Sequence, residues 1–404
     1  MVVRPGATTR RRATVNLTTK KCIDYYFGGC LVALLKPFAM LLGAVLKRDH
    51  SVVATGDIVV IKMQGGGSLL VAAPALQGIR TAYPGCRMIL ITTKALRPFG
   101  ETVNAFDEIR CIDDSGIIQL ITSAFHVLWK SRTADSIIDL EVYSRLTGVL
   151  ALATCARNRL GFYLEATFWR RGVYTHLLFF NRYAPVHFFY DQIALTMSAA
   201  VTSRADAASR VVERLPAMLH REEYVTIGPG CSDLAVERRL PTDGWVKHLS
   251  AYHAQHPDTA LAFVGNAADR PLASEIIGGL QREYPRIRCE NRCGELSLPE
   301  SLSVVRGAVR YFGIDSALLH YARLFAVPSE SFWGPVMPGQ LLRPWADVED
   351  VTHYVQLPCS PCVHVAETPP CRGNNACMRC LFDEDLRDRM PEWIHSHTPW
   401  TRLQ

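Results

Sequence analysis

Short apolar runs alternate with longer segments whose apolar residues recur at helical spacing, and this alternation continues along most of the chain. In the first half it predicts helices at 69–82 and 117–130 and strands at 57–63, 87–92, 107–112 and 135–142. In the second half it predicts helices at 245–253 and 271–284 and strands at 223–227, 261–264, 309–312 and 331–333. Strands that alternate with helices form parallel sheets, so the expected fold class is α/β, with two Rossmann-like, doubly wound domains facing a central cleft.

The stretch 309–335 contains the clearest strand–loop–helix unit, with the sequence VRYFGIDSALLHYARLFAVPSESFWGP. Asp315 and Ser316 stand where the N-cap of a helix is expected. The loops that follow parallel strands gather at one edge of the sheet, where helix N-termini attract anions. The sequence therefore predicts a site for a nucleotide diphosphate at this edge.

Changes in composition divide the chain into five expected parts. A basic tail and an amphipathic segment occupy residues 1–56, and the first α/β domain occupies 57–202. A linker at 203–222 leads to the second α/β domain at 223–350. Residues 351–404 form a cysteine-rich tail with a final helix.

The segment 22–46 is apolar with a few interruptions, which are Asp24, Gly28, Gly29, Lys36 and Pro37. A spanning helix needs about 20 uninterrupted apolar residues. Two short amphipathic pieces, hinged at Pro37 and lying in the membrane interface, therefore fit the pattern better. The other interpretation is a helix packed on the chain's own surface.

The net charge of +6 is concentrated near the N-terminus, where residues 1–50 carry nine Lys and Arg against Asp24 and Asp49. A basic excess confined to one segment argues against a nucleic-acid-binding body and favours contact with an anionic membrane surface. Thirteen scattered cysteines without a signal peptide before them indicate a reducing compartment. We therefore expect a cytoplasmic protein, peripheral on the inner face of the cytoplasmic membrane.

Residues 161–190 hold eleven aromatic side chains, interleaved with Arg170, Arg171 and Arg182. Rings and guanidinium groups together suit a lipid headgroup, a sugar face or a stacked base. The alternative is that these rings fill the space between the two domains.

Four segments resemble the sequence hallmarks of the heptosyltransferases of glycosyltransferase family 9. They are VIKMQGGGSLLVAAPALQGIRTAYPG (60–85), IDLEVYSRL (138–146), IGPGCSDLAVERRLP (227–241) and YFGIDSALLHYARLFAVPSESFWGP (311–335). The resemblance covers residues 57–386 and implies the GT-B fold, with the acceptor bound by the first domain and the nucleotide-sugar donor by the second. It also implies a bacterial enzyme of lipopolysaccharide biosynthesis that inverts the anomeric carbon and requires no metal ion or other cofactor for catalysis.

The resemblance implies a donor-binding set in the second domain, which stabilises the departing diphosphate with N–H groups, hydroxyls and fixed cations. Its members are Gly230, Ser232, Arg238, Arg239, Asp315, Ser316, His320, Gly334 and Pro335. Arg238 and Arg239 replace a Lys-Arg pair of the family, so a cation is kept but its phosphate geometry changes. From the residues alone, Arg238 can also be a solvated surface charge, Asp315 a helix cap and His320 a core histidine.

The first domain departs from the family at the expected general base. The family's glycine-rich loop ends in an aspartate, whereas Gly65, Gly66 and Gly67 are followed here by Ser68. A serine hydroxyl cannot act as a base at neutral pH without help, so either another carboxylate takes the role or the chain does not catalyse transfer. Glu141 is the best substitute, because it ends a parallel strand that should flank this loop.

Asp139 and Arg145 complete the expected acceptor side, together with the three glycines. Asp139 lies two residues before Glu141 on the same strand face, and Arg145 follows both. The alternative role for Glu141 is that of a strand-end carboxylate that holds Arg145 in place.

Five cysteines near the C-terminus follow the spacing C-x2-C-x8-C-x5-C-x2-C. Four thiolates can complete a tetrahedron around a structural zinc ion. The expected ligands are Cys359, Cys362, Cys377 and Cys380. A compact loop of buried thiols is the other interpretation.

The expected function is transfer of a heptose-like sugar from an ADP-heptose-type nucleotide sugar to a lipid-linked or lipopolysaccharide-core glycan. Two alternatives stay open at this point. One is a nucleotide-sugar epimerase of the same fold, which needs no separate acceptor. The other is a catalytically silent GT-B partner protein that binds the nucleotide sugar, because Ser68 replaces the expected aspartate.

Overall fold

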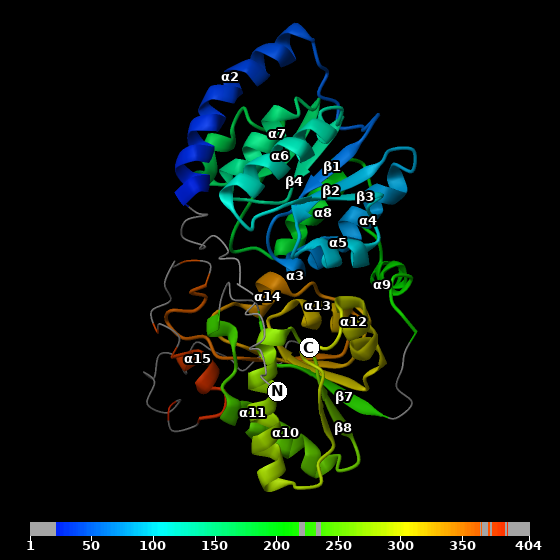
Figure 1. The fold of residues 1–404 in the computed structure, drawn as a ribbon, viewed down its shortest axis with the longest axis vertical. Helices are drawn as coiled ribbons and strands as arrows, with labels where there is room; N and C mark the ends of the chain where they lie inside the picture. The colour runs from blue at the N-terminus through cyan, green and yellow to red at the C-terminus, as the bar shows by residue number, and fades with distance from the viewer. Residues whose placement is uncertain are drawn as a thin grey trace, which may run out of the picture.

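Two six-stranded parallel sheets form the framework of the chain. The computed structural model describes residues 22–217, 223–231, 236–363, 365, 371, 374–383 and 386. The sheets lie in two domains stacked along the long axis of the molecule, the first above the second (Figure 1). The expected fold class, α/β with two doubly wound domains, is confirmed.

The first sheet has the order β3-β2-β1-β4-β5-β6. Its strands are β1 (Ile58–Ile61), β2 (Met88–Thr93), β3 (Glu108–Ile112), β4 (Ser136–Asp139), β5 (Asn158–Tyr163) and β6 (His176–Phe179). The helices between and after them are α3 (Gly66–Val71), α4 (Ala73–Ala82), α5 (Arg97–Val103), α6 (Ile117–Ser131), α7 (Arg145–Ala153), the 3-10 helix η2 (Glu165–Arg170) and α8 (Val186–Thr196). Helices cover both faces of this sheet, which explains why every residue of β1 is apolar and buried.

The two faces of the first sheet have separate cores. On one face, α3, α4 and α8 pack against side chains such as Val60 and Leu90. On the other face, α6, α7 and the N-terminal helix α2 (Gly29–Val45) pack against side chains such as Val59 and Ile89. The helix α2 is therefore part of the outer layer of the first domain (Figure 1).

The N-terminal apolar segment forms one continuous helix, so the expected hinge at Pro37 is wrong. The π-helical turn η1 (Ile23–Gly28) leads directly into α2, which continues through Pro37 because its inner side packs along α7. Asp24 accepts hydrogen bonds from Ser144 Oγ and from the N–H groups of Arg145 and Leu146, which begin α7. Residues Ile23–Val45 are long and apolar enough to cross a membrane by length and composition, and they also pack on the chain's own surface.

The second sheet has the order β12-β11-β10-β7-β8-β9. Its strands are β7 (Tyr224–Gly228), β8 (Ala260–Phe263), β9 (Cys289–Asn291), β10 (Arg310–Ile314), β11 (Ser329–Trp333) and β12 (Asp350–Tyr354). Its helices are η3 (Val236–Arg238), α10 (Thr242–Gln255), η4 (Ala267–Asp269), α11 (Arg270–Glu283), α12 (Leu298–Gly307), α13 (Ala317–Leu324), α14 (Pro338–Leu341) and α15 (Ala376–Arg379). Because β12 pairs with β11, this domain extends past the expected boundary at residue 350.

The two domains pack on each other through α3 and α13. Tyr321 and Leu324 of α13 are buried in the core of the first domain. Arg343, which precedes β12, donates to both carboxylate oxygens of Asp191 in α8, at 2.8 and 2.6 Å. In the expected linker, α9 (Arg204–Val212) forms a helix that packs on α4 and α13, so much of the linker belongs to the domain contact.

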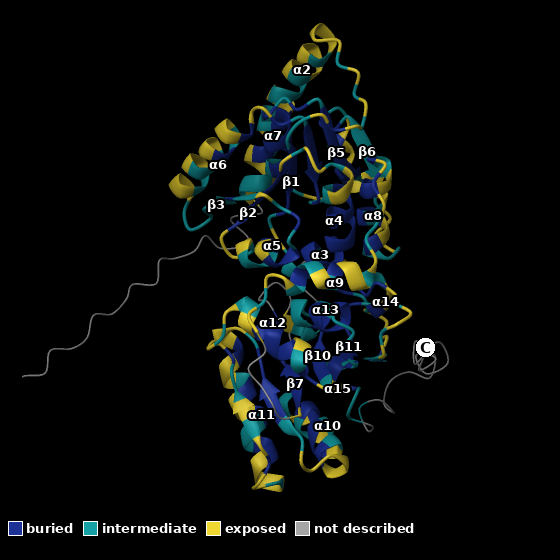
Figure 2. Cartoon of the chain, turned by 90° about the vertical axis from the view of Figure 1, so that its right-hand side faces the viewer, coloured by how far each residue is buried: buried dark blue, intermediate teal, exposed yellow. Residues whose placement is uncertain are grey.

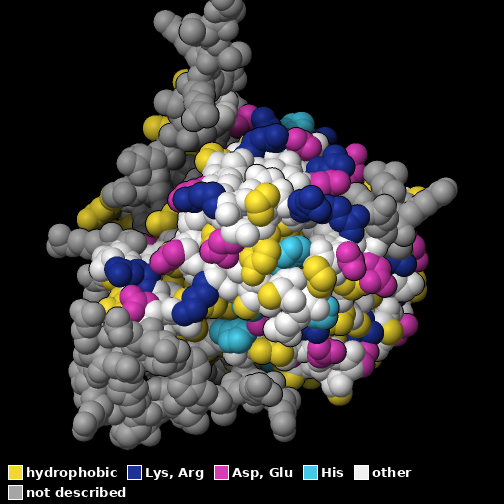
Figure 3. Space-filling model, turned by 90° about the horizontal axis from the view of Figure 1, so that it is seen from below, with side chains coloured by type: hydrophobic (Ala, Val, Ile, Leu, Met, Phe, Trp, Pro, Cys, Tyr) yellow, Lys and Arg dark blue, Asp and Glu magenta, His cyan; other side chains and the backbone are white. Residues whose placement is uncertain are grey.

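The outer end of the second domain mixes basic and acidic side chains (Figure 3). Exposed ion pairs also occur elsewhere in this domain, such as Arg270–Glu295 at 2.9 Å and Arg292–Glu290 at 3.0 Å. Such interspersed charges are typical of a solvated surface.

Candidate functional site

The glycine-rich loop after β1 meets the start of α13 across the domain boundary. Gly65 has a φ of 79°, a left-handed conformation that turns the chain into α3. A Cβ on Gly67 would lie 3.1 Å from His320 Cδ2 and 3.7 Å from Ala317 Cα, so glycine allows the two elements to touch. The loop expected to serve the acceptor and the helix expected to serve the donor are therefore adjacent.

His320 lies on α13 at this contact rather than in the core of its own domain. Burial lowers the pKa of His320 to about 4, although the charge of Asp315 opposes the shift. The imidazole is therefore neutral near pH 7. A neutral imidazole can accept or donate one hydrogen bond to a ligand.

Glu141 lies two residues past the end of β4 and is bound to the segment that leads into the glycine-rich loop. Its Oε1 atom accepts hydrogen bonds from Lys62 Nζ at 3.1 Å and from the N–H groups of Met63 at 2.7 Å and Gln64 at 3.0 Å. Donors of this kind interact best with an ionised carboxylate. Within the described part of the chain, no hydrogen bond reaches Oε2, so this oxygen is left for a ligand or solvent.

Lys62 and Tyr190 extend this polar group toward Ser68. Burial alone would lower the pKa of Lys62, but the negative charge of Glu141 reverses the shift and raises it. Burial raises the pKa of Tyr190, and a side-chain interaction with Ser68 and the charge of Lys62 offset part of that rise. Ser68, the residue in place of the expected aspartate, therefore stands next to a neutral phenol.

Asp139 is fully buried below this group and supports it. Its carboxylate accepts hydrogen bonds from Arg170 Nη2 and Thr147 Oγ1, both at 2.8 Å, and from the Tyr174 hydroxyl. It also accepts the N–H of Glu141 at 2.9 Å. Burial raises the pKa of Asp139, while Arg170 and Tyr174 act in the opposite direction. The position of Asp139 fits a support for Glu141 rather than direct contact with an acceptor.

Arg145 is not held by Glu141, so that alternative is wrong. Its guanidinium carbon lies 3.9 Å from the ring centroid of Tyr25, and its backbone N–H donates to Asp24 at 2.9 Å. Arg145 lies at a helix N-terminus that faces the N-terminal segment, whereas Glu141 turns toward β1. The structure thus separates Arg145 from the acceptor-side residues with which it was grouped.

On the donor side, Arg238 pairs with Asp315. Arg238 Nη1 lies 3.1 Å from Asp315 Oδ2 and also donates to the carbonyl oxygen of Asp315 at 3.2 Å. The sequence alone also allowed a solvated surface charge for Arg238 and a helix cap for Asp315. Neither alternative is correct, because the two side chains are paired with each other. Ser232, which was grouped with them, lies outside the described residues.

The turn between β10 and α13 contains buried hydroxyl groups. Ser316 occupies the N-cap position of α13, but its side chain does not cap the helix. Ser316 Oγ and the Tyr311 hydroxyl are both buried and interact with each other, and neither makes a hydrogen bond to any other described residue. Burial raises the pKa of Tyr311, so its hydroxyl keeps its proton. Two hydroxyls that share one contact keep spare hydrogen-bonding capacity, and a phosphate oxygen could accept a hydrogen bond there.

Gly230 also lies at this end of the second sheet. A Cβ on Gly230 would meet Asp269 Oδ1 at 1.9 Å, so the loop after β7 approaches a carboxylate that only glycine can accommodate. The carbonyl of Arg239 accepts a hydrogen bond from Asn375 Nδ2 at 3.1 Å, while its side chain interacts with Cys231 in the loop after β7.

Gly334 and Pro335 are buried under the cysteine-rich segment. A Cβ on Gly334 would lie 2.5 Å from Cys377 Sγ, and the carbonyl of Gly334 accepts a hydrogen bond from Ser360 Oγ at 2.9 Å. Their role in lining the nucleotide site stays a prediction.

The four expected zinc ligands are all among the described residues, and Cys359 lies close enough to Cys362 and Cys377 to raise the pKa of both thiols, after burial. No group of three or more His, Cys, Asp and Glu in the described part of the chain is arranged to hold a metal ion. Cys362, Cys377 and Cys380 are buried, and Cys377 and Cys380 belong to the core of the second domain. Burial raises the pKa of Cys377 to about 12, which keeps its thiol protonated. The zinc site and the alternative of a compact loop of buried thiols both stay untested predictions.

Lys62, Tyr190, Asp269 and Tyr311 belong to the site, and the sequence analysis missed them. Lys62 had a signal, because a cation at the end of an otherwise apolar buried strand needs a counter-charge. The other three had none, since their neighbours in space come from distant parts of the chain.

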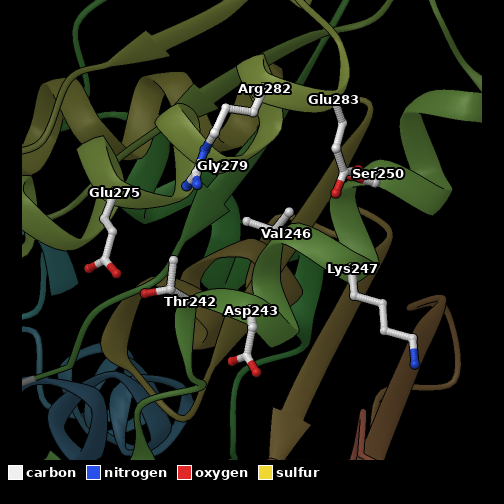
Figure 4. Close-up of a pocket in the computed structure, with 9 residues that line it drawn as sticks. All are labelled: Thr242, Asp243, Val246, Lys247, Ser250, Glu275, Gly279, Arg282 and Glu283. Atoms are coloured by element: carbon white, nitrogen blue, oxygen red, sulfur yellow. The ribbon is translucent and has the colours of Figure 1, made fainter.

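A hollow of about 830 Å³ lies elsewhere, between α10 and α11 of the second domain (Figure 4). Acidic, basic, apolar and small polar residues line it together: Thr242, Asp243, Val246, Lys247, Ser250, Glu275, Gly279, Arg282 and Glu283. None of the site residues expected from the sequence lines it. We therefore place the candidate site at the contact between α3 and α13, not in this hollow.

Comparison with known proteins connects this geometry to a family. Residues 180–371 match the model of glycosyltransferase family 9 (heptosyltransferase). A curated relative, lipooligosaccharide heptosyltransferase 2 of Haemophilus influenzae, is 26% identical over 144 residues, which are 36% of this chain. The matched residues span 40% of that relative's length.

Solved structures share the fold over most of the chain. The E. coli ADP-heptose LPS heptosyltransferase II has a TM-score of 0.56 at 16% identity, covering 80% of this chain and 98% of that one. The glycosyltransferase family 9 structure from Veillonella parvula has a TM-score of 0.59 at 14% identity, covering 86% and 99%. Residues 180–371 are therefore similar to glycosyltransferase family 9, and the chain as a whole shares the GT-B fold of the heptosyltransferase structures.

Proposed function

We propose that this protein is an inverting, metal-independent glycosyltransferase. It moves a heptose-like sugar from an ADP-heptose-type donor to a lipid-linked or lipopolysaccharide-core glycan. The contact of the Gly67 loop with the start of α13 carries the proposal, because it brings the expected acceptor and donor elements together.

The donor's diphosphate would lie at the turn between β10 and α13. Ser316 Oγ and the Tyr311 hydroxyl offer unused hydrogen-bonding capacity there. Arg238 adds a cation that is fixed by Asp315. These groups would stabilise the negative charge that grows on the departing nucleotide, which is the main task of a transferase without a metal ion. The donor and acceptor named for the E. coli structure above support the choice of ADP-heptose and lipopolysaccharide.

Glu141 would act as the general base. Its Oε1 is fixed by three donors, and Oε2 carries no hydrogen bond from the described residues. The acceptor hydroxyl would lose its proton to Oε2 while its oxygen attacks the anomeric carbon, and the nucleoside diphosphate would leave from the opposite face. Lys62 and the N–H groups of residues 63 and 64 would keep the carboxylate oriented for this transfer.

The acceptor would reach the site from a membrane. The helix α2 and the basic residues that precede and follow it support a location on the inner face of the cytoplasmic membrane. Attachment of the enzyme to the same surface as its acceptor raises their effective concentration.

The direct test is a transfer assay with ADP-heptose and detergent-solubilised lipopolysaccharide-core acceptors, using Glu141→Gln. We expect the variant to lose activity by about 100-fold or more, while ADP raises the melting temperature of both proteins equally.

Product with the opposite anomeric configuration to the donor, formed equally well in EDTA, would support the inverting and metal-independent parts of the proposal. Glu101→Gln, an exposed carboxylate on α5, is the matched control. Full activity of the Glu141→Gln variant would exclude Glu141 as the base.

A silent partner protein is the second candidate, favoured by one observation. Ser68 lies beside the neutral phenol of Tyr190, and a serine hydroxyl is not itself a base near pH 7. In this case ADP-heptose would stabilise the wild-type protein without turnover of any acceptor. A Ser68→Asp variant that gains transfer activity would indicate that the family's base had been lost.

A further inference from the structure

The outer side of α6 is apolar and exposed. Its exposed large side chains are Ile117 (52%), Ile118 (73%), Ile121 (45%), Phe125 (68%) and Trp129 (67%). They recur every three or four residues and so form one stripe, while Val127 on the other side is buried in the core. No acidic residue interrupts α6. A continuous exposed apolar stripe of this kind marks an interaction surface.

The helix α2 presents a second apolar surface in the same layer of the domain. Its exposed side chains include Leu34, Phe38, Leu41 and Val45. The inner sides of α2 and α6 pack into a single cluster on one face of the first sheet, so their outer sides both point away from that sheet. Figure 2 shows exposed residues along the outer sides of both helices, on a domain margin away from the second domain. We call this surface the α2–α6 face.

The ends of the two helices have the chemistry of a membrane interface. The guanidinium carbon of Arg132 lies 4.2 Å from the ring centroid of Trp129, and Lys130 is exposed beside them. Lys47, which follows α2, is exposed as well. Tryptophan and basic residues at the edge of an apolar surface are typical of contact with anionic headgroups, whereas a protein interface would not require a basic rim.

We propose that the α2–α6 face docks on an anionic phospholipid bilayer, with α6 as a second contact beside the N-terminal helix. Asp24 ties the start of α2 to α7, so α2 stays on the domain and lies in the membrane surface together with α6. Two separate helices fix the orientation of the domain on the membrane, which one helix cannot do. This inference extends the membrane contact of the proposed function, yet it can fail while transfer activity is retained, because it is tested without donor or acceptor.

The test is flotation of the full chain with vesicles of phosphatidylglycerol and phosphatidylethanolamine. The variant Phe125→Ser/Trp129→Ser removes two large apolar side chains from α6 and should lower the fraction bound by about tenfold or more. Binding that remains would come from basic residues and should fall further in high salt. A second pair on the same stripe, Ile118→Ser/Ile121→Ser, should behave alike. Melting curves check that both variants fold, as expected for exposed positions.

The matched control is Phe188→Ser/Leu195→Ser on α8, whose side chains are 52% and 63% exposed but lie on the opposite face of the sheet. This pair should bind vesicles like the wild type. Wild-type binding by both folded α6 variants would overturn the proposal. Failure of the wild-type protein to bind vesicles would also overturn it. So would a dimer in solution that the α6 substitutions dissociate, because the stripe would then be a protein interface.

Discussion

At the scale of single residues, the site depends on charges that are placed by partners far away in sequence. Lys62 directly follows β1, and Glu141 lies just after the neighbouring strand β4. The charge of each side chain is balanced by the other. The sequence predicted that Glu141 would flank the glycine-rich loop, because parallel strands end at a common edge. It did not predict Lys62 as its partner, because residues after β4 contain a nearer candidate, Arg145, which instead stacks on Tyr25.

Buried neutral histidines should make the protein sensitive to acid. Burial lowers the pKa of His187, His248 and His320 to about 4 in each case. In the unfolded chain these groups take up protons at about pH 6.5, so between about pH 6.5 and 4 the unfolded state binds more protons. The free energy of unfolding should therefore fall as the pH is lowered through this window, by up to about 3 kcal/mol for each histidine. Urea titrations at several pH values measure it.

His248 allows this expectation to be tested at one position. Its ring packs against Phe312 and Phe332, with Glu330 and His353 nearby. His248→Phe removes the titrating group and should reduce the loss of stability between about pH 6.5 and 4. His256→Phe, at an exposed position, should leave the pH dependence unchanged. If the free energy of unfolding depends on pH equally in both variants and in the wild type, the buried imidazole of His248 is not the cause.

At the scale of elements, apolar periodicity predicted eight of the twelve described strands, because a strand covered on both faces must be a continuous apolar run. It missed β5, β6, β9 and β12, of which β9 and β12 are partly exposed at the two edges of their sheet and carry no such signal. It also broke the N-terminal helix at Pro37. Packing against α7 holds that helix together, and this contact cannot be inferred from the local sequence.

Close contacts between elements give a prediction on glycine. A Cβ on Gly78 in α4 would lie 1.9 Å from the carbonyl oxygen of Ala200, which is backbone and cannot rotate away. Gly78→Ala should therefore destabilise the protein by about 1–3 kcal/mol, because the helix or the loop must shift. A Cβ on Gly278 in α11 would meet no atom within 4 Å, so Gly278→Ala should stabilise by about 0.5–1 kcal/mol through helix propensity. Urea unfolding compares the two, and similar effects would show that crowding at Ala200 is unimportant.

At the scale of the whole molecule, the sequence predicted two facing domains but not what joins them. Its motifs placed the donor and acceptor elements at the carboxyl ends of two parallel sheets, and Gly67 and His320 do meet there. The joining contacts are made by residues outside every motif, such as Arg343, Asp191 and the helix α9. Their pairing depends on how the two domains are oriented, which is a property of the packed molecule and not of any segment.

The pair Arg343–Asp191 provides the test of this joint. The guanidinium makes two hydrogen bonds to the carboxylate, and the side chains are only 10% and 18% exposed. Arg343→Met should cost about 2–4 kcal/mol of unfolding free energy, because it leaves a largely buried carboxylate without its partner. Arg97→Met, which breaks the exposed pair with Glu101, should cost less than about 1 kcal/mol. Urea unfolding of the two variants measures both costs.

A double-mutant cycle separates the pair from other effects of the substitution. If the two residues join the domains through each other, Arg343→Met and Asp191→Leu together should cost clearly less than the sum of the single changes, with a coupling above about 1 kcal/mol. The double variant should also transfer sugar more slowly than the wild type, because α8 and the segment before β12 would no longer fix the approach of α13 to the Gly67 loop. Additive costs would mean that Arg343 and Asp191 do not join the domains through each other.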